Sequence, residues 1–154
     1  MKNFEVLDIS GDVGLKAYGK DLIDSFINAA IGMYSLITDL EMIEEHKSID
    51  VSVKSDSVEG LLVSWLNELI FHFDAYGLVG KKIAVAEFTP ALTLPPLCTG
   101  MGGGEICRLK ASVSGEEFDP KRHESKLLIK AATYHRLKVE KTDDLWEINV
   151  IFDI

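Results

Sequence analysis

Five aspartates stand where the sequence predicts turns or strand ends, and they are the side chains best suited to bind a metal ion. They are Asp8, Asp12, Asp39, Asp119 and Asp153. Such positions hold a carboxylate in place while leaving it accessible, and hard divalent cations prefer carboxylate and main-chain oxygens. Any single aspartate can also simply cap a turn or a helix. The residues alone therefore leave metal binding and turn capping both open.

The segment INVIFDI, residues 148–154, poses a sharper electrostatic problem. Its alternation of apolar and polar residues predicts a strand. Asp153 lies one residue from the carboxylate expected at the chain end, so two anionic groups come close together on an element that the core needs. Something must make that arrangement tolerable.

Other chemically active residue types give weaker signals. His46, His72, His123 and His135 are scattered without ligand spacing, although Asp119 and Glu124 could hold His123. No Ser-His-Asp or Cys-His arrangement can be inferred from them. The glycine-rich GMGGGE lacks the GK[ST] ending and the following helix of a phosphate-binding loop, so we interpret it as a loop.

Composition narrows the classes of partner. The chain has 154 residues, which fits one domain over 1–154, and its net charge is −9. Such a surface repels a phosphate backbone, so we expect no autonomous nucleic-acid binding. It suits a basic protein partner or a cation.

The chain start and the cysteines predict a cytoplasmic protein. MKNFEVLD has no apolar core of signal-peptide length, and no segment approaches the roughly 20 apolar residues of a membrane span. Cys98 and Cys107 match no zinc motif, and a reducing compartment argues against a disulfide. We therefore expect two free thiols and no membrane association.

Two amphipathic helices dominate the expected architecture. One spans 22–37 with Asp21 as its cap, and the other begins at an Asp56–Glu59 capping box and ends near Gly77. Strands are expected at FEVLDI, at VGLKAYG, up to about Lys54, and over 81–88, 105–115, 126–141 and 146–153. A Pro- and Gly-rich loop separates two of them at 89–104. This order predicts an α+β fold, with a mostly antiparallel sheet packed against two main helices.

Seven separated motifs give the chain a resemblance to a known family. They are DVG (12–14), AYG (17–19), TDL (38–40), WLNEL (65–69), GEEFDPKRHE (115–124), IKAATYH (129–135) and VIFDI (150–154). In order and approximate spacing they resemble the archease family, over nearly the whole chain. The resemblance implies one β-α-β-β unit inserted in another. It also implies a non-catalytic protein cofactor that promotes guanylylation and multiple turnover of an RtcB-type tRNA-splicing RNA ligase and broadens its nucleotide use.

The resemblance also implies where the site lies. Its metal ligands correspond to Asp12, Asp153 and the terminal residue Ile154, which would bind calcium or magnesium. A divalent cation would turn the repulsion at the chain end into shared attraction to one centre. Lys130 matches a lysine that the family uses, although a solvated strand lysine is an equal alternative.

The remaining correspondences leave alternatives open. Asp119, Arg122 and His123 are candidates for contact with the ligase, and they could equally fix a turn onto the sheet. Where the family has a histidine in the motif before its first metal ligand, this chain has Ile9. A general chaperone-like binding module is the alternative function. A metal-dependent hydrolase ranks last because there are few ligands and no evident general base.

Overall fold

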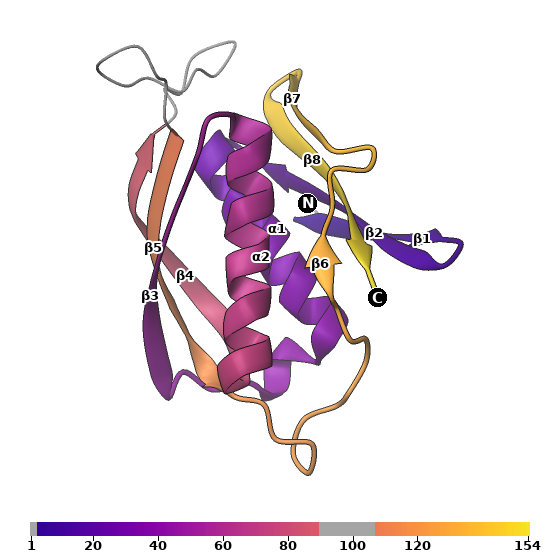
Figure 1. Ribbon diagram of the computed structural model, residues 1–154, viewed down its shortest axis with the longest axis vertical. Helices are drawn as coiled ribbons and strands as arrows, with labels where there is room; N and C mark the ends of the chain where they lie inside the picture. The colour runs from indigo at the N-terminus through magenta and orange to yellow at the C-terminus, as the bar shows by residue number, and fades with distance from the viewer. Residues whose placement is uncertain (1–2, 90–106) are drawn as a thin grey trace.

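The computed structural model describes residues 3–89 and 107–154, and these form two antiparallel sheets with two helices between them (Figure 1). In chain order the elements are β1 (Phe4–Ile9), β2 (Asp12–Gly19), α1 (Leu22–Ile37), the 3₁₀ turn η1 (Leu40–Met42), β3 (Lys47–Ser55), α2 (Val58–Tyr76), β4 (Leu78–Thr89), β5 (Cys107–Glu117), β6 (Ala131–Ala132), β7 (Lys138–Thr142) and β8 (Leu145–Asp153).

The strands divide between the sheets according to their place in the chain. Strands β1, β2, β8 and β6 form the larger sheet in that order, with β7 also paired to β8, while the smaller sheet has the order β3-β5-β4. The segment β3-α2-β4-β5 is thus a β-α-β-β unit that lies within an outer unit made of the N- and C-terminal elements. The α+β prediction is confirmed, with two sheets in place of one.

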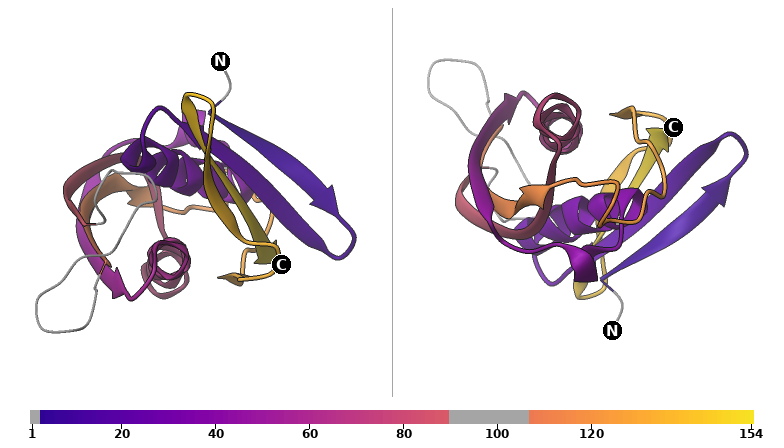
Figure 2. Two further views of the ribbon diagram at one scale, coloured as in Figure 1. Left: turned by 90° about the horizontal axis from the view of Figure 1, so that it is seen from above. Right: turned by 90° about the horizontal axis from the view of Figure 1, so that it is seen from below.

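Both helices pack against both sheets (Figure 2). Helix α1 contacts β2 and β8 on one side and β4 on the other, while α2 covers β3 and also reaches β6. The apolar stripe predicted for the second helix is buried, with Trp65 and Leu69 fully inaccessible. The Trp65 indole N–H donates to the Phe26 carbonyl at 3.1 Å, which satisfies the one polar atom of this large side chain and joins the two helices.

The helix boundaries follow local capping chemistry. Asp21 caps α1 as expected, accepting from the Asp24 N–H at 2.7 Å. Helix α2 is capped by Ser57, one residue after the expected Asp56, because the extended backbone of Ser57 aims its hydroxyl at the Gly60 N–H. The helix ends at Gly77, whose left-handed φ of 73° suits glycine.

Several expected features differ in the structure. The strands expected across 126–141 shrink to β6 and β7, with extended and turn segments around them. Most of the 89–104 loop lies outside the described residues. Cys107 is buried and disulfide-bonded, so the expectation of a free thiol there is wrong. That expectation depended on a compartment that residue spacing does not establish. Cys98 lies outside the described residues.

Among the described residues, no helix has both the length and the apolar character needed to cross a membrane.

The Ser57 cap yields a test of stability. Replacing Ser57 with alanine removes the acceptor for the Gly60 N–H, so we expect the free energy of unfolding to fall by about 1 kcal/mol. Ser57→Asp keeps an acceptor and should recover most of the loss. Urea unfolding of the three proteins measures this. Equal damage from both substitutions would contradict the assigned cap.

Candidate functional site

Two of the predicted ligands lie at the same end of neighbouring strands. Strands β2 and β8 run antiparallel, with Val13 opposite Phe152 and Gly14 opposite Ile151. One step further along this register, Asp12 at the start of β2 lies beside Asp153 at the end of β8. Residues separated by most of the chain are therefore cross-strand neighbours.

The alternation of side chains places both carboxylates on the outer face of the sheet. Val13 and Phe152 point into the core, where they are 6% and 0% exposed. Since successive side chains of a strand point to opposite faces, Asp12 and Asp153 point away from the core. Asp12 is half-buried and Asp153 exposed. Like charges directly opposite each other destabilise a sheet. A cation between Asp12 and Asp153 would remove the repulsion that this register creates.

Ile154 and Lys130 lie next to the same pair. Strand β6 pairs with the end of β8, placing Ala131 opposite Asp153. The Lys130 N–H donates to the Asp153 carbonyl at 2.8 Å. The side chain of Lys130 is exposed and Ile154 is 39% exposed. This end of the larger sheet therefore brings together two carboxylates on its outer face, the main chain of Ile154 and the main chain of Lys130. An all-oxygen donor set of this kind fits Ca²⁺ or Mg²⁺.

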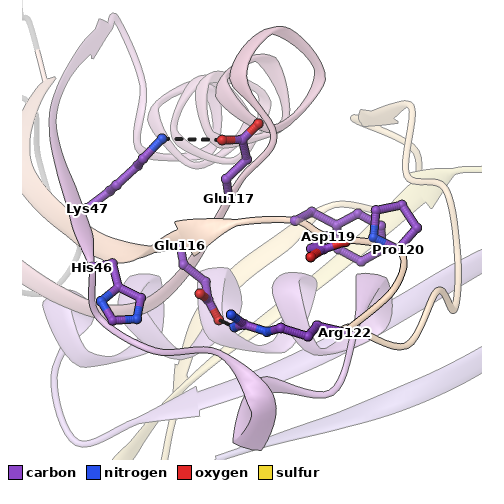
Figure 3. A pocket seen from close by; sticks show the side chains of 8 residues that line it. His46, Lys47, Glu116, Glu117, Asp119, Pro120 and Arg122 are labelled. Atoms are coloured by element: carbon purple, nitrogen blue, oxygen red, sulfur yellow. Dashed lines mark hydrogen bonds and ion pairs between the residues drawn. The ribbon is translucent and has the colours of Figure 1, made fainter.

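The other three predicted site residues, Asp119, Arg122 and His123, lie elsewhere, in the turn that follows β5 near the buried Glu116. Figure 3 shows Asp119 and Arg122 beside Glu116. Glu116 is 6% exposed, and its Oε1 accepts from the Arg122 guanidinium at 2.6 Å, from His123 Nε2 at 2.9 Å and from the Glu44 N–H at 3.1 Å. Burying a carboxylate is costly unless it is paired and hydrogen-bonded, and this one is both.

His123 has a fixed protonation pattern in this network. The Asp119 N–H donates to Nδ1 at 2.8 Å, so Nδ1 is unprotonated and Nε2 carries the proton that it donates to Glu116. The His123 main chain in turn donates to the Asp119 carbonyl at 2.7 Å. His123 is 4% exposed and fixes the turn to the sheet. Its carboxylate partner is Glu116, whereas Glu124 was expected from the sequence.

The ionised form of Glu116 is strongly favoured. Burial would raise its pKa, but hydrogen bonds from the Glu44 N–H, His123 and Arg122 outweigh burial and lower the pKa from 4.5 to about 2. A pocket of about 500 Å³ opens over this carboxylate, lined also by His46, Lys47 and Asp119 (Figure 3). Arg122 remains about half exposed there, so it is bound to Glu116 and still accessible.

Sequence reasoning missed the centre of this second cluster. Glu116 lies in the GEEFDPKRHE motif, where nothing distinguishes it from the glutamate beside it, and Glu44 and His46 lie about 70 residues before it in the chain. Their only local signal was a strand-forming pattern, which carries no information about partners from another strand.

The geometry defines a small α+β protein with a carboxylate pair on the outer face of one sheet and a polar pocket beside the other. Comparison with known proteins identifies its family. The model of the Archease protein family matches residues 4–154, so the chain belongs to the archease family. The chain is 34% identical to the protein archease of Aeropyrum pernix, covering 94% of this chain and 92% of that one. It is 35% identical to that of Methanosarcina acetivorans, covering 99% and 97%.

Two solved structures share the fold. The solution structure of protein 1598 from Methanobacterium thermoautotrophicum superposes with a TM-score of 0.80 at 30% identity, covering all of both chains. The crystal structure of an archease, described as a possible chaperone, from Thermotoga maritima has a TM-score of 0.60 at 16% identity, covering 96% of this chain and 94% of that one.

The Glu116 network predicts a specific pH dependence. Because its folded-state pKa lies below the ordinary value, ionised Glu116 stabilises the fold fully above about pH 4.5, and this contribution is lost as the pH falls toward 2. We expect Glu116→Gln to be less stable than the parent protein at pH 6, with the difference narrowing below pH 4.5. Urea unfolding between pH 6 and pH 2.5 measures it. A difference that stays constant over this range would contradict the assignment.

Proposed function

We propose that this chain is the activating cofactor of an RtcB-type RNA ligase, without ligase activity of its own. In this proposal it promotes guanylylation of the ligase, allows multiple turnovers during tRNA splicing and broadens the nucleotide that is accepted. Membership of the archease family supports it. The observation that carries it is the β2–β8 register, which gives Asp12 and Asp153 the adjacency that the implied metal site needs.

The outer-face residues have complementary roles in this proposal. The carboxylates of Asp12 and Asp153, with the main-chain oxygens of Ile154, would hold Ca²⁺ or Mg²⁺. Such an ion supplies positive charge that attracts and orients phosphate oxygens. Lys130, held beside Asp153 through its main chain, would contribute a second positive charge at the same edge. Both strand ends are anchored by the core, so these groups are held ready before any partner binds.

Electrostatics would guide docking onto the ligase. A net charge of −9 suits approach to the basic surface that a ligase needs for its RNA, so association should weaken as salt is added. Of the candidate contact residues, Arg122 and Asp119 line an open pocket and are available to a partner. His123 is buried, so its part would be to hold the turn that presents the other two.

A general protein-binding module is the second candidate. Two aromatic side chains on α2, Phe71 and Tyr76, are 54% and 65% exposed, and their rings contact each other. Exposed aromatic surface of this kind favours contact with other proteins. Breadth distinguishes the two functions: a chaperone-like module would suppress aggregation of unrelated clients, whereas an activator would act on one ligase.

The ligation reaction tests the main proposal. With the organism's own ligase below the substrate concentration, we expect the chain to raise product well beyond one equivalent per ligase and to increase the ligase–GMP adduct. Adding salt should reduce the stimulation. Unchanged product and unchanged guanylylation would overturn the proposed function.

The metal ligands can be tested within the same assay. Asp12→Asn and Asp153→Asn each keep the size of the side chain but remove a charge, so we expect stimulation to fall by about tenfold or more. Asp50→Asn removes an exposed carboxylate from β3 in the other sheet and should leave stimulation unchanged. Full stimulation by either of the first two variants, with circular dichroism confirming their fold, would remove Asp12 and Asp153 from the mechanism.

A further inference from the structure

The polar pocket of Figure 3 lies beside a set of metal-ligand donors that neither the carboxylate pair nor the proposed ligase activation uses. His46 and Glu116 line the pocket, and Glu44 lies close to both of them. Each of the three offers one ligand atom, and these atoms lie within 4.8 Å of one another. Among the described residues, these three side chains form the one group of at least three histidines, cysteines or carboxylates that lie close enough together to share an ion. These residues flank the smaller sheet, whereas Asp12 and Asp153 belong to the larger one.

The main chain holds this group in place before any ligand arrives. The His46 N–H donates to the Gly115 carbonyl at 2.8 Å, and the Glu44 N–H donates to Glu116 Oε1 at 3.1 Å. Ile43, just before them, is 1% exposed, and its carbonyl accepts from the Lys81 ammonium. The segment that carries two of the donors is thus fixed to β5, which carries the third.

Glu116 is the most informative of the three donors. It is 6% exposed, and all the donors recorded for it among the described residues reach Oε1. Its Oε2 therefore keeps its lone pairs in a carboxylate that lines an open pocket. Arg122 and His123 orient this carboxylate through their bonds to Oε1, as hydrogen-bonding groups commonly do for the ligands of a metal.

The other two donors are hydrogen-bonded to each other, at a place where one metal ion could bind both. His46 Nε2 lies 2.5 Å from Glu44 Oε2, and both side chains are mostly exposed. An ion between them would bind the imidazole nitrogen and the carboxylate oxygen in place of the hydrogen bond that now joins these two atoms. One nitrogen and two carboxylate oxygens favour a divalent transition ion such as Zn²⁺ over the hard Ca²⁺ and Mg²⁺.

We propose that Glu44, His46 and Glu116 form a second metal site, selective for a divalent transition ion and separate from the carboxylate pair. Three protein ligands leave at least one coordination position open, and the pocket above is wide enough for water or a donor from another molecule. The lysine that lines this pocket, Lys47, is paired with Glu117 at 3.3 Å, which reduces its repulsion of an incoming cation.

Zinc titration of the chelator-treated protein tests this site. By calorimetry we expect one Zn²⁺ to bind in the pocket, with the affinity falling by about tenfold or more in His46→Ala and in Glu44→Gln. Glu45→Gln removes the same charge from the neighbouring residue, and His135→Ala removes another exposed histidine. Neither should change the affinity. All four replaced side chains are exposed, so the thermal midpoints should stay close to that of the parent protein.

Cobalt provides a spectroscopic readout of coordination beside the zinc affinity. Co²⁺ should give visible absorption bands with the parent protein, with Glu45→Gln and with Asp12→Asn, and these bands should be absent with His46→Ala. Unchanged zinc affinity in His46→Ala would overturn the site, as would equal losses in Glu44→Gln and Glu45→Gln, or no zinc binding by the parent protein. Loss of the cobalt bands in Asp12→Asn would overturn its independence from the first site.

Discussion

The pairing of β2 with β8 is the constraint on which both the fold and the candidate site depend. It joins segments from the two ends of the chain into the centre of the larger sheet. Its register is fixed by burial, because a slip of one residue would turn Val13, Leu15 and Phe152 out of the core. The register that buries these side chains also sets Asp12 beside Asp153 on the opposite face. The free energy gained by burying these apolar side chains therefore offsets the repulsion between the two carboxylates.

Glu116 is a second point at which distant segments meet. Its carboxylate joins β5 to the segment before β3 and to the 119–123 turn, through donors from a main-chain amide, an imidazole and a guanidinium. An ionised side chain is tolerated there because donors replace the water that burial removed. The same side chain lines a pocket, so one residue can both fix a turn and offer a ligand.

The sequence predicted local features better than pairings. The stripes of α1 and α2 and the caps at Asp21 and Gly77 are set by neighbours a few residues away, and they are confirmed. Asp56 and Ser57 are both good cap residues, and only the backbone angles distinguish them. The division into two sheets depends on which strands meet across the chain, and alternation along one strand does not specify that. The disulfide of Cys107 could not be predicted for a similar reason, since its formation depends on a partner cysteine close in space and on the redox state of the compartment.

The candidate sites differ in how they could be found. By residue type and position, Asp12 and Asp153 do not differ from the three other candidate aspartates. The resemblance to archeases is what distinguishes them as metal ligands. Their adjacency then followed from the strand register. For Glu44, His46 and Glu116 the chain separation removed any spacing signal, and only the structure brought them together.

The central claim is that Asp12 and Asp153 bind one cation together, and an NMR titration with Ca²⁺ tests it most directly. Calcium avoids ambiguity with the histidine-containing cluster because it prefers oxygen ligands. The account predicts that the amide signals of residues 12–14 and 151–154 shift together along a single binding curve, and that Asp12→Asn abolishes the shifts on both strands. Shifts on only one strand, or shifts that persist in Asp12→Asn, would contradict a shared site.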